Sequence, residues 1–305
     1  MFRAMTSSRR GLWSIVGAAT LWGTTGVATR AIYDISSTSP LSVAFLRLAI
    51  GACVLLLLCG RLLGRSVWRV KGRDALLMLF LGTMQAVFQF AYLAAIPDCG
   101  ITIATLIALC VAPVIVVLYS ALFMRERVTL RILFALLCAL AGTILLTGTP
   151  GKVGNSAHFL TGILLSLLCA AGYAGVILSG RALSSRYHPL QVNATAFGIG
   201  ALLLFGCSLT THLVFTYPAQ GWLLLLYLGC VPTALAYMLF QAGMRSTPAT
   251  LTSILTLCEP LTAAILAWIL FGERLTLPGI VGALLLLGTI LLLARSEAAP
   301  EGEPL

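Results

Sequence analysis

Two charged residues lie inside long apolar stretches of this sequence, where their chemistry needs an explanation. Glu259 lies in the run LTLCEPLTAAILAWILF and Arg47 in the run LSVAFLRLAIGACVLLLLC. A carboxyl group in such surroundings can exchange a proton or neutralise an amine, whereas a guanidinium presents a fixed positive fork to a carboxylate or phosphate. A charge at the centre of a membrane helix costs ~2.5–3.5 kcal/mol, so both residues are candidates for substrate or ion binding.

Each charge also has a plainer explanation. Glu259 can be held by the hydroxyl groups of Thr252 or Thr256 on its own helix, and Arg47 can extend its guanidinium toward lipid headgroups. Pro260 follows the acid, lacks an N–H group and permits a kink there. The remaining acids are expected at helix ends, in loops or in the tail: Asp34, Asp74, Asp98, Glu126, Glu273, Glu297, Glu301 and Glu303.

Further candidates come from polar and aromatic residues at helical spacing. Gln85, Phe88, Gln89 and Tyr92 follow the pattern i, i+3, i+4, i+7, which places them on one face of a helix. Such a face should point into a bundle, where it lines a pathway or bonds across helices. Weaker candidates of the same kind are Trp22, Thr24, Thr25, Tyr173, Tyr237 and Gln241.

Composition identifies the solvent in which these helices must fold. Of the 305 residues, 60% are hydrophobic and only 9% are charged, and the mean hydropathy is +1.04. A soluble protein cannot cover that much apolar surface, whereas a bilayer accepts helices of roughly 20 apolar residues. The sequence therefore predicts an all-α integral membrane protein. Ten spans are expected: Leu12–Ile32, Leu41–Cys59, Ala75–Ile96, Ile101–Phe123, Leu130–Leu146, Phe159–Leu178, Leu190–Thr210, Trp222–Ala242, Leu251–Phe271 and Leu277–Leu293.

The basic residues indicate an orientation. With a cytoplasmic N-terminus and ten alternating helices, most of the 19 lysines and arginines fall on the inner side. This asymmetry follows the positive-inside rule and predicts that both termini are cytoplasmic. The first span is expected to be a retained helix and not a signal peptide.

The chain also repeats itself. LCVAPVIVVLYSALFMRERVTL (109–130) aligns with LCEPLTAAILAWILFGERLTL (257–277), and AGTILL (141–146) aligns with LGTILL (287–292). Each copy holds five predicted helices, so the second copy must enter the membrane from the opposite side. Inverted repeats of this kind are typical of secondary transporters, whose substrate site lies between the halves.

Depth along the spans places the two buried charges near one another. At ~1.5 Å per residue, Glu259 lies about 12 Å from one face and Arg47 about 9 Å from the other. Across a core of ~30 Å they differ in height by roughly 9 Å, so one cavity can hold both.

The sequence resembles the EamA family of the drug/metabolite transporter superfamily over nearly its whole length. The matching motifs are LWGTTGVATR (21–30), SPLSVAFLRLAIGA (39–52) and CEPLTAAILAWILFGERLT (258–276). The resemblance implies a carrier in the cytoplasmic membrane, often an exporter of amino acids or other small metabolites. The expected organisation is a first repeat over 12–148, a second over 159–294 and a disordered cytoplasmic tail over 295–305.

The two repeats differ in the residues that carry charge. Glu259 corresponds to Ala112 in the first repeat, and Arg47 corresponds to Ala196 in the second. Arg30 stands where family members frequently have a lysine. The helices of the two repeats are therefore expected to be related by symmetry, whereas the charged residues are expected in only one repeat each.

These observations favour a secondary active transporter of a small metabolite, driven by protons and acting as an exporter. The alternative function is an uptake permease for an anionic metabolite, in which Arg47 binds the anion. An intramembrane enzyme is disfavoured because no HExxH or GxSxG motif occurs and the three histidines lie in predicted loops; a channel or receptor remains a third class. We expect no cofactor, metal or nucleic acid, lipids around the spans, protons as coupling ion, and a monomer or homodimer.

Overall fold

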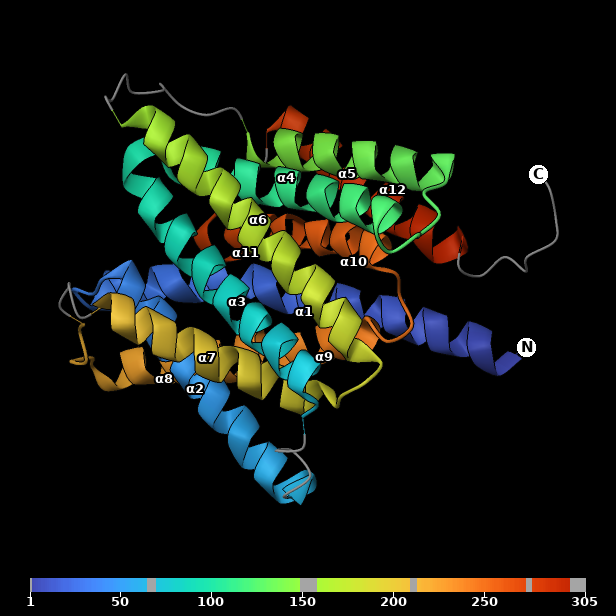
Figure 1. Ribbon diagram of the computed structural model, residues 1–305. Helices are drawn as coiled ribbons and strands as arrows, with labels where there is room; N and C mark the ends of the chain where they lie inside the picture. Colours follow the sequence, from blue (N-terminus) through green and yellow to red (C-terminus); the bar gives the residue numbers. More distant parts are fainter. Residues whose placement is uncertain (1, 65–69, 149–157, 209–212, 273–275, 297–305) are drawn as a thin grey trace.

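The structure is a computed structural model that describes residues 2–64, 70–148, 158–208, 213–272 and 276–296 (Figure 1). Of the tail expected at 295–305, only residues 295 and 296 are described, at the end of the C-terminal helix. Glu273 of the repeated segment lies outside the described residues. Every regular element within the described ranges is helical.

Ten helical segments follow one another along the chain, as the sequence predicts. The first half contains α1 (Phe2–Ile35), α2 (Pro40–Leu62), α3 (Gly72–Cys99), α4 (Ile101–Leu122) and α5 (Leu130–Thr147). The second half contains α6 (Phe159–Ser184), α7 (Pro189–Ser208), α8 (Ala219–Leu228), the π segment η2 (Gly229–Leu235), α9 (Ala236–Gly243), α10 (Ala249–Leu255), the 3₁₀ segment η3 (Thr256–Cys258), α11 (Glu259–Phe271) and α12 (Leu277–Ser296). The elements α8, η2 and α9 form one continuous span, and α10, η3 and α11 form the next.

Nine of these segments in the described part of the chain are long and apolar enough to cross a membrane. The exception is α1, which is helical for 34 residues but whose middle, LWGTTGVATR, is rich in threonine and glycine. Many large apolar side chains point outward, including Leu57, Leu130 and Leu277. Such exposure fits hydrocarbon and not water, so the chain is a multi-pass membrane protein.

Local sequence signals set several helix ends. Ser39 caps α2 by accepting a hydrogen bond from the Ser42 amide at 3.1 Å, and Pro40 occupies the first turn. Gly100, with φ of 82°, separates α3 from α4 in a backbone conformation that side chains rarely tolerate. These two signals fix the start of α2 and the sharp reversal between α3 and α4.

The contacts between helices reveal the internal symmetry. α2 packs on α7 and α5 packs on α12, so the second and fifth helices each contact their own counterparts. In the same way, α3 packs on α6 while the α8–α9 span packs on α1. The two copies run in opposite directions, because α1 and α6 begin at opposite ends of the bundle (Figure 1). The halves are therefore intertwined and share one interior.

Candidate functional site

Arg47 and Glu259 come from different halves of the chain. Arg47 lies on α2 of the first half, and Glu259 is the first residue of α11 in the second half. Glu259 directly follows the 3₁₀ segment, and Pro260 occupies the first turn of α11, where a missing N–H group is harmless. The expected kink beside the acid is thus a short change of helix type.

The two charged side chains lie within electrostatic reach of each other. Both are surrounded by protein, yet each remains only half-buried. The two halves therefore bring one basic and one acidic side chain into the same part of the interior, where transporters with inverted repeats bind their substrates.

Neither of the alternative explanations agrees with the contacts, namely that threonine hydroxyls hold Glu259 and that Arg47 extends toward lipid headgroups. Thr252 donates its hydroxyl hydrogen to the Pro248 carbonyl and Thr256 donates to the Ser253 carbonyl, each at 2.8 Å. Each hydroxyl has one hydrogen, so neither is available to Glu259. The Nε atom of Arg47 is buried without a hydrogen-bond partner, and the guanidinium lies in reach of Tyr237 and Glu259 inside the bundle.

An aromatic cluster forms one side of the site. The ring centroid of Tyr237 on α9 lies 4.8 Å from that of Trp22 on α1 and 4.9 Å from that of Phe197 on α7. Phe240 lies 5.0 Å from Trp22 and closes the cluster. Gln85 of α3 donates its amide to the Tyr237 hydroxyl at 3.3 Å. Tyr237 thus directly contacts two other predicted residues, Trp22 and Gln85.

The predicted face of α3 continues toward α6. Phe88 stacks on Tyr173 with ring centroids 5.1 Å apart, and Tyr173 is within electrostatic reach of Glu259. Tyr92, one turn further, hydrogen-bonds Thr105 at 2.7 Å and also lies in reach of Glu259. Gln89 is 7% exposed. The stripe therefore lies where α3 of the first half packs on α6 of the second.

Not every candidate joins this cluster. Thr25 is half-buried on α1, and it is the neighbouring Thr24 that accepts a hydrogen bond from Tyr227, at 2.8 Å. Gln241 donates its amide to the Gly180 carbonyl at 2.6 Å and serves helix packing. Two contributors were missed by sequence reasoning, namely Phe197 and Asn193, whose amide donates to the Tyr237 carbonyl at 2.9 Å. The only available signal was the polar Asn193 inside an apolar span.

The site has more hydrogen-bond donors than acceptors. Among the described residues, several buried side-chain polar atoms have no partner, and four of them belong to this neighbourhood. They are Trp22 Nε1, Arg47 Nε, Gln89 Nε2 and the Tyr173 hydroxyl. All four can donate a hydrogen, and two of them, on Arg47 and Tyr173, belong to side chains within electrostatic reach of Glu259. The lining is therefore suited to a ligand with several acceptor oxygens.

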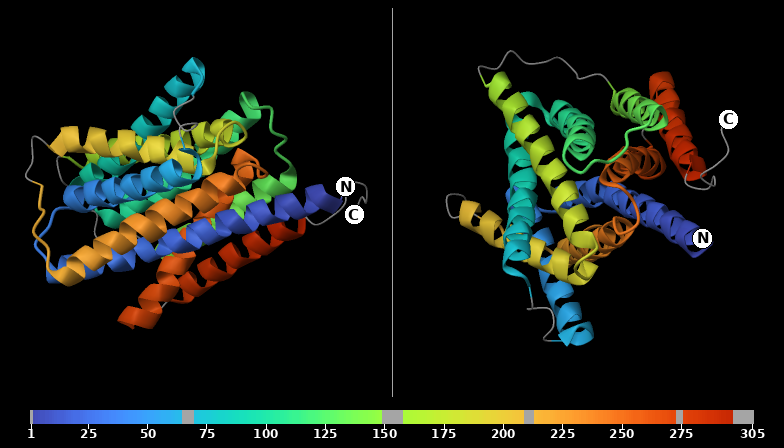
Figure 2. Two further views of the ribbon diagram at one scale, coloured as in Figure 1. Left: turned by 90° about the horizontal axis from the view of Figure 1, so that it is seen from below. Right: turned by 45° about the vertical axis from the view of Figure 1, so that its right-hand side comes forward.

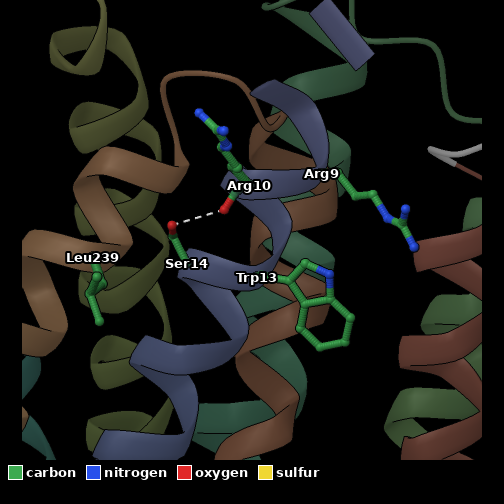
Figure 3. Close-up of a pocket in the computed structure, with 5 residues that line it drawn as sticks. All are labelled: Arg9, Arg10, Trp13, Ser14 and Leu239. Atoms are coloured by element: carbon green, nitrogen blue, oxygen red, sulfur yellow. Dashed lines mark hydrogen bonds between the residues drawn. The ribbon is translucent and has the colours of Figure 1, made fainter. Parts of the chain in front are cut away.

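Away from this site, the described residues form hollows on the surface at the end of the bundle where α1 begins. The larger, about 660 Å³, is an open groove lined by Arg9, Arg10, Trp13, Ser14 and Leu239 (Figure 3). Arg9 and Arg10 point in different directions, and the Ser14 hydroxyl bonds the Arg10 carbonyl at 2.8 Å (Figure 3). A groove whose charges diverge does not form a binding fork for one anion.

Comparison with known proteins identifies the family. The sequence pattern of the family described as "EamA-like transporter family" matches residues 9–148 and again residues 160–295, so both halves carry the family pattern. The chain therefore belongs to the EamA-like transporter family. It is a membrane transporter and not an enzyme.

Several curated relatives span nearly the whole chain. "Uncharacterized transporter YwfM" of Bacillus subtilis (strain 168) is 31% identical over 94% of each chain. "Pseudopaline exporter CntI" of Pseudomonas aeruginosa (strain PAO1) is 26% identical, covering 90% of this chain and 93% of its own. A crystal structure with 23% identity covers 95% of this chain at a TM-score of 0.80 and shows that the fold is the same.

Proposed function

We propose that this transporter exports amino acids or similar small metabolites in exchange for protons, by alternating access around Arg47 and Glu259. The observation that carries the proposal is the position of the two charges, one from each half, within electrostatic reach of each other inside the bundle. If the halves rock against each other, a ligand held by both charges is exposed to one face and then to the other.

The charges suit a zwitterion. A carboxylate can pair with the Arg47 guanidinium while an ammonium group pairs with ionised Glu259. The unpartnered donors of Trp22, Gln89 and Tyr173 can bond further oxygen atoms of the substrate. The aromatic rings beside them offer apolar contact for a side chain.

Export against a gradient follows if a proton and the substrate ammonium compete for Glu259. When the ammonium leaves, the carboxyl group takes a proton, and the site returns without an unpaired buried negative charge. Release of that proton on the cytoplasmic side restores the carboxylate for the next substrate. The relative named as an exporter is consistent with this direction.

The test uses purified protein in liposomes with a trapped pH indicator and each labelled amino acid in turn. An antiporter accumulates the amino acid when the vesicle interior is acidic, and substrate entry raises the interior pH. Glu259→Gln should abolish accumulation driven by the gradient and retain exchange of labelled for unlabelled substrate. Asp34→Asn, an exposed acid at the end of α1, is the matched control.

Two outcomes contradict the proposal. Gradient-driven accumulation that is unchanged in Glu259→Gln would exclude this residue from coupling. Movement of no amino acid under either gradient would remove the substrate class.

Uptake of an anionic metabolite is the second candidate, and the excess of donors around Arg47 favours it. In that case an anion binds Arg47 while Glu259 is protonated, so proton and substrate travel together. Accumulation would then require an alkaline vesicle interior. The sign of the effective gradient therefore separates the two functions in one experiment.

A further inference from the structure

A second set of polar contacts joins the two halves outside the transport site, at the end of the bundle where α1 begins. Successive spans alternate in direction, so α2, α4, α6 and α9 end, and α3, α5, α7 and α10 begin, toward this end of the bundle (Figures 1 and 2). Described residues of all four connections between them carry the contacts given below, together with the starts of α3 and α10.

The first contact centres on Asp74, in the first turn of α3. One carboxylate oxygen accepts a hydrogen bond from the Arg186 guanidinium at 2.6 Å, and the other accepts one from the Tyr187 hydroxyl at 2.8 Å. The Tyr187 hydroxyl in turn accepts a hydrogen bond from the Lys71 amide at 3.1 Å. Asp74 is 5% exposed, so it joins the first half to the α6–α7 connection as a buried, fully used carboxylate.

The second contact involves Glu126, in the connection between α4 and α5. Its two carboxylate oxygens accept hydrogen bonds from the amides of Ala249 and Thr250 at 2.9 and 3.0 Å. Ala249 begins the span that leads to Glu259. The preceding residue, Arg125, has φ of 55°, a left-handed conformation that is unfavourable for a residue with a side chain. Backbone strain next to a contact between mobile halves is typical of switch regions.

Arg245 connects the two contacts within the second half. Its guanidinium donates hydrogen bonds to the Ser184 carbonyl at 2.9 Å and to the Tyr187 carbonyl at 3.1 Å. It lies four residues before Ala249, so the segment bonded to Glu126 is tied to the segment bonded to Asp74. A movement that breaks one contact therefore pulls on the other.

We infer that the contacts of Asp74 and Glu126 form a single ionic latch, which closes this face of the transporter and opens as a unit in each cycle. This inference rests on the transport function proposed above. Both contacts join one half to the other, so relative rotation of the halves must break them together. The latch residues position the halves and do not touch the substrate.

The test measures hydrogen–deuterium exchange of the full-length protein in nanodiscs, without substrate or pH gradient. Asp74→Asn should speed amide exchange in residues 184–190 and also at the start of α10, in residues 249–252. Loss of charge-assisted hydrogen bonds predicts an increase of about tenfold. Arg73→Gln, an exposed charge beside Asp74, should leave both segments unchanged.

The distant response is the decisive measurement, because Asp74 makes no described contact with α10. If Asp74→Asn changes exchange only near residues 71–74 and 184–190, the contacts are local fold elements and the inference is wrong. Glu126→Gln provides the reverse test, with faster exchange expected at 184–190, and it remains available if Asp74→Asn does not fold. Since the readout needs no transport, failure of the latch is distinguishable from failure of the proposed function.

Discussion

Gly23 of α1 lies directly against the backbone of Glu259. A Cβ atom added to Gly23 would come 2.8 Å from the Glu259 carbonyl oxygen and 2.6 Å from Cβ of Thr262. Two of the neighbours of such an atom are backbone atoms of α11, which cannot move as a flexible side chain does. The absence of a side chain at position 23 thus sets how closely the first helix approaches the acid.

Gly23→Ala should therefore lower both thermal stability and transport. Overpacking of this kind costs typically about 1–3 kcal/mol and displaces the start of α11. Gly26→Ala on the same helix is the control, because an added Cβ there meets nothing within 4 Å. We expect Gly26→Ala to be neutral or slightly stabilising. Melting curves and initial transport rates of the two variants check this; equal behaviour would contradict the close approach.

The interaction between Arg47 and Glu259 should appear as thermodynamic coupling. Arg47→Ala removes the positive charge within electrostatic reach of half-buried Glu259, so it should lower thermal stability, by less than the ~3–5 kcal/mol lost when a fully buried ion pair is broken. Adding Glu259→Gln to Arg47→Ala should recover part of that loss. A double-mutant cycle on thermal stability measures the coupling, and additivity within about 0.5 kcal/mol would show that the two residues act independently.

Tyr237→Phe should destabilise the protein by leaving the Gln85 amide without its acceptor. An unsatisfied buried polar group costs about 1–3 kcal/mol, while the aromatic packing on Trp22 is retained. Tyr227→Phe is a suitable comparison, because Tyr227 is 36% exposed and Thr24, which accepts its hydrogen bond, still donates to the Leu21 carbonyl, so no donor loses its acceptor. Thermal denaturation of both variants should show a clearly larger loss for Tyr237→Phe.

His188, in the connection between α6 and α7, should make stability depend on pH. Burial and the nearby Arg245 lower the pKa of His188 below its ordinary value of 6.5. The folded state therefore favours the neutral ring, whose Nδ1 accepts a hydrogen bond from the Leu190 amide at 3.3 Å. This contribution is present above pH 6.5 and is lost as the pH falls through the lowered pKa.

Melting temperatures measured between pH 7.5 and 5 check this prediction. The decrease on acidification should be smaller in His188→Gln than in the unmodified chain, and the effect should be modest because the ring is exposed. His158→Gln, an exposed histidine before α6, should behave like the unmodified chain. Identical pH profiles for His188→Gln and the unmodified chain would contradict it.

The sequence predicted the spans well because hydrophobic runs in a membrane must be helices. The span expected at Ile101–Phe123 is observed at Ile101–Leu122, and the one expected at Leu130–Leu146 is observed at Leu130–Thr147. The helical extension of α1 to Phe2–Ile35 was missed, because polar residues beyond an apolar core carry no membrane signal.

The parts that could not be predicted depend on contacts between distant residues. The span expected at Trp222–Ala242 contains the π segment Gly229–Leu235, which packs on α2 around Gly51. Glu126 was expected as an ordinary acid near a helix end, yet it bonds the start of α10. Its recurrence in the repeated MRERVTL and FGERLTL segments was a signal, but the partner amides could only come from the fold.

The π and 3₁₀ turns of the eighth and ninth spans have no counterparts in α3 and α4, which run unbroken through Gly72–Cys99 and Ile101–Leu122. The two halves, although both carry the family pattern, are thus not interchangeable in structure. Two first halves paired with each other would supply two arginines and no acid, and two second halves would supply the reverse. If both charges act as proposed, only a pairing of unlike halves provides the complete site, and a single chain that contains both halves guarantees that pairing.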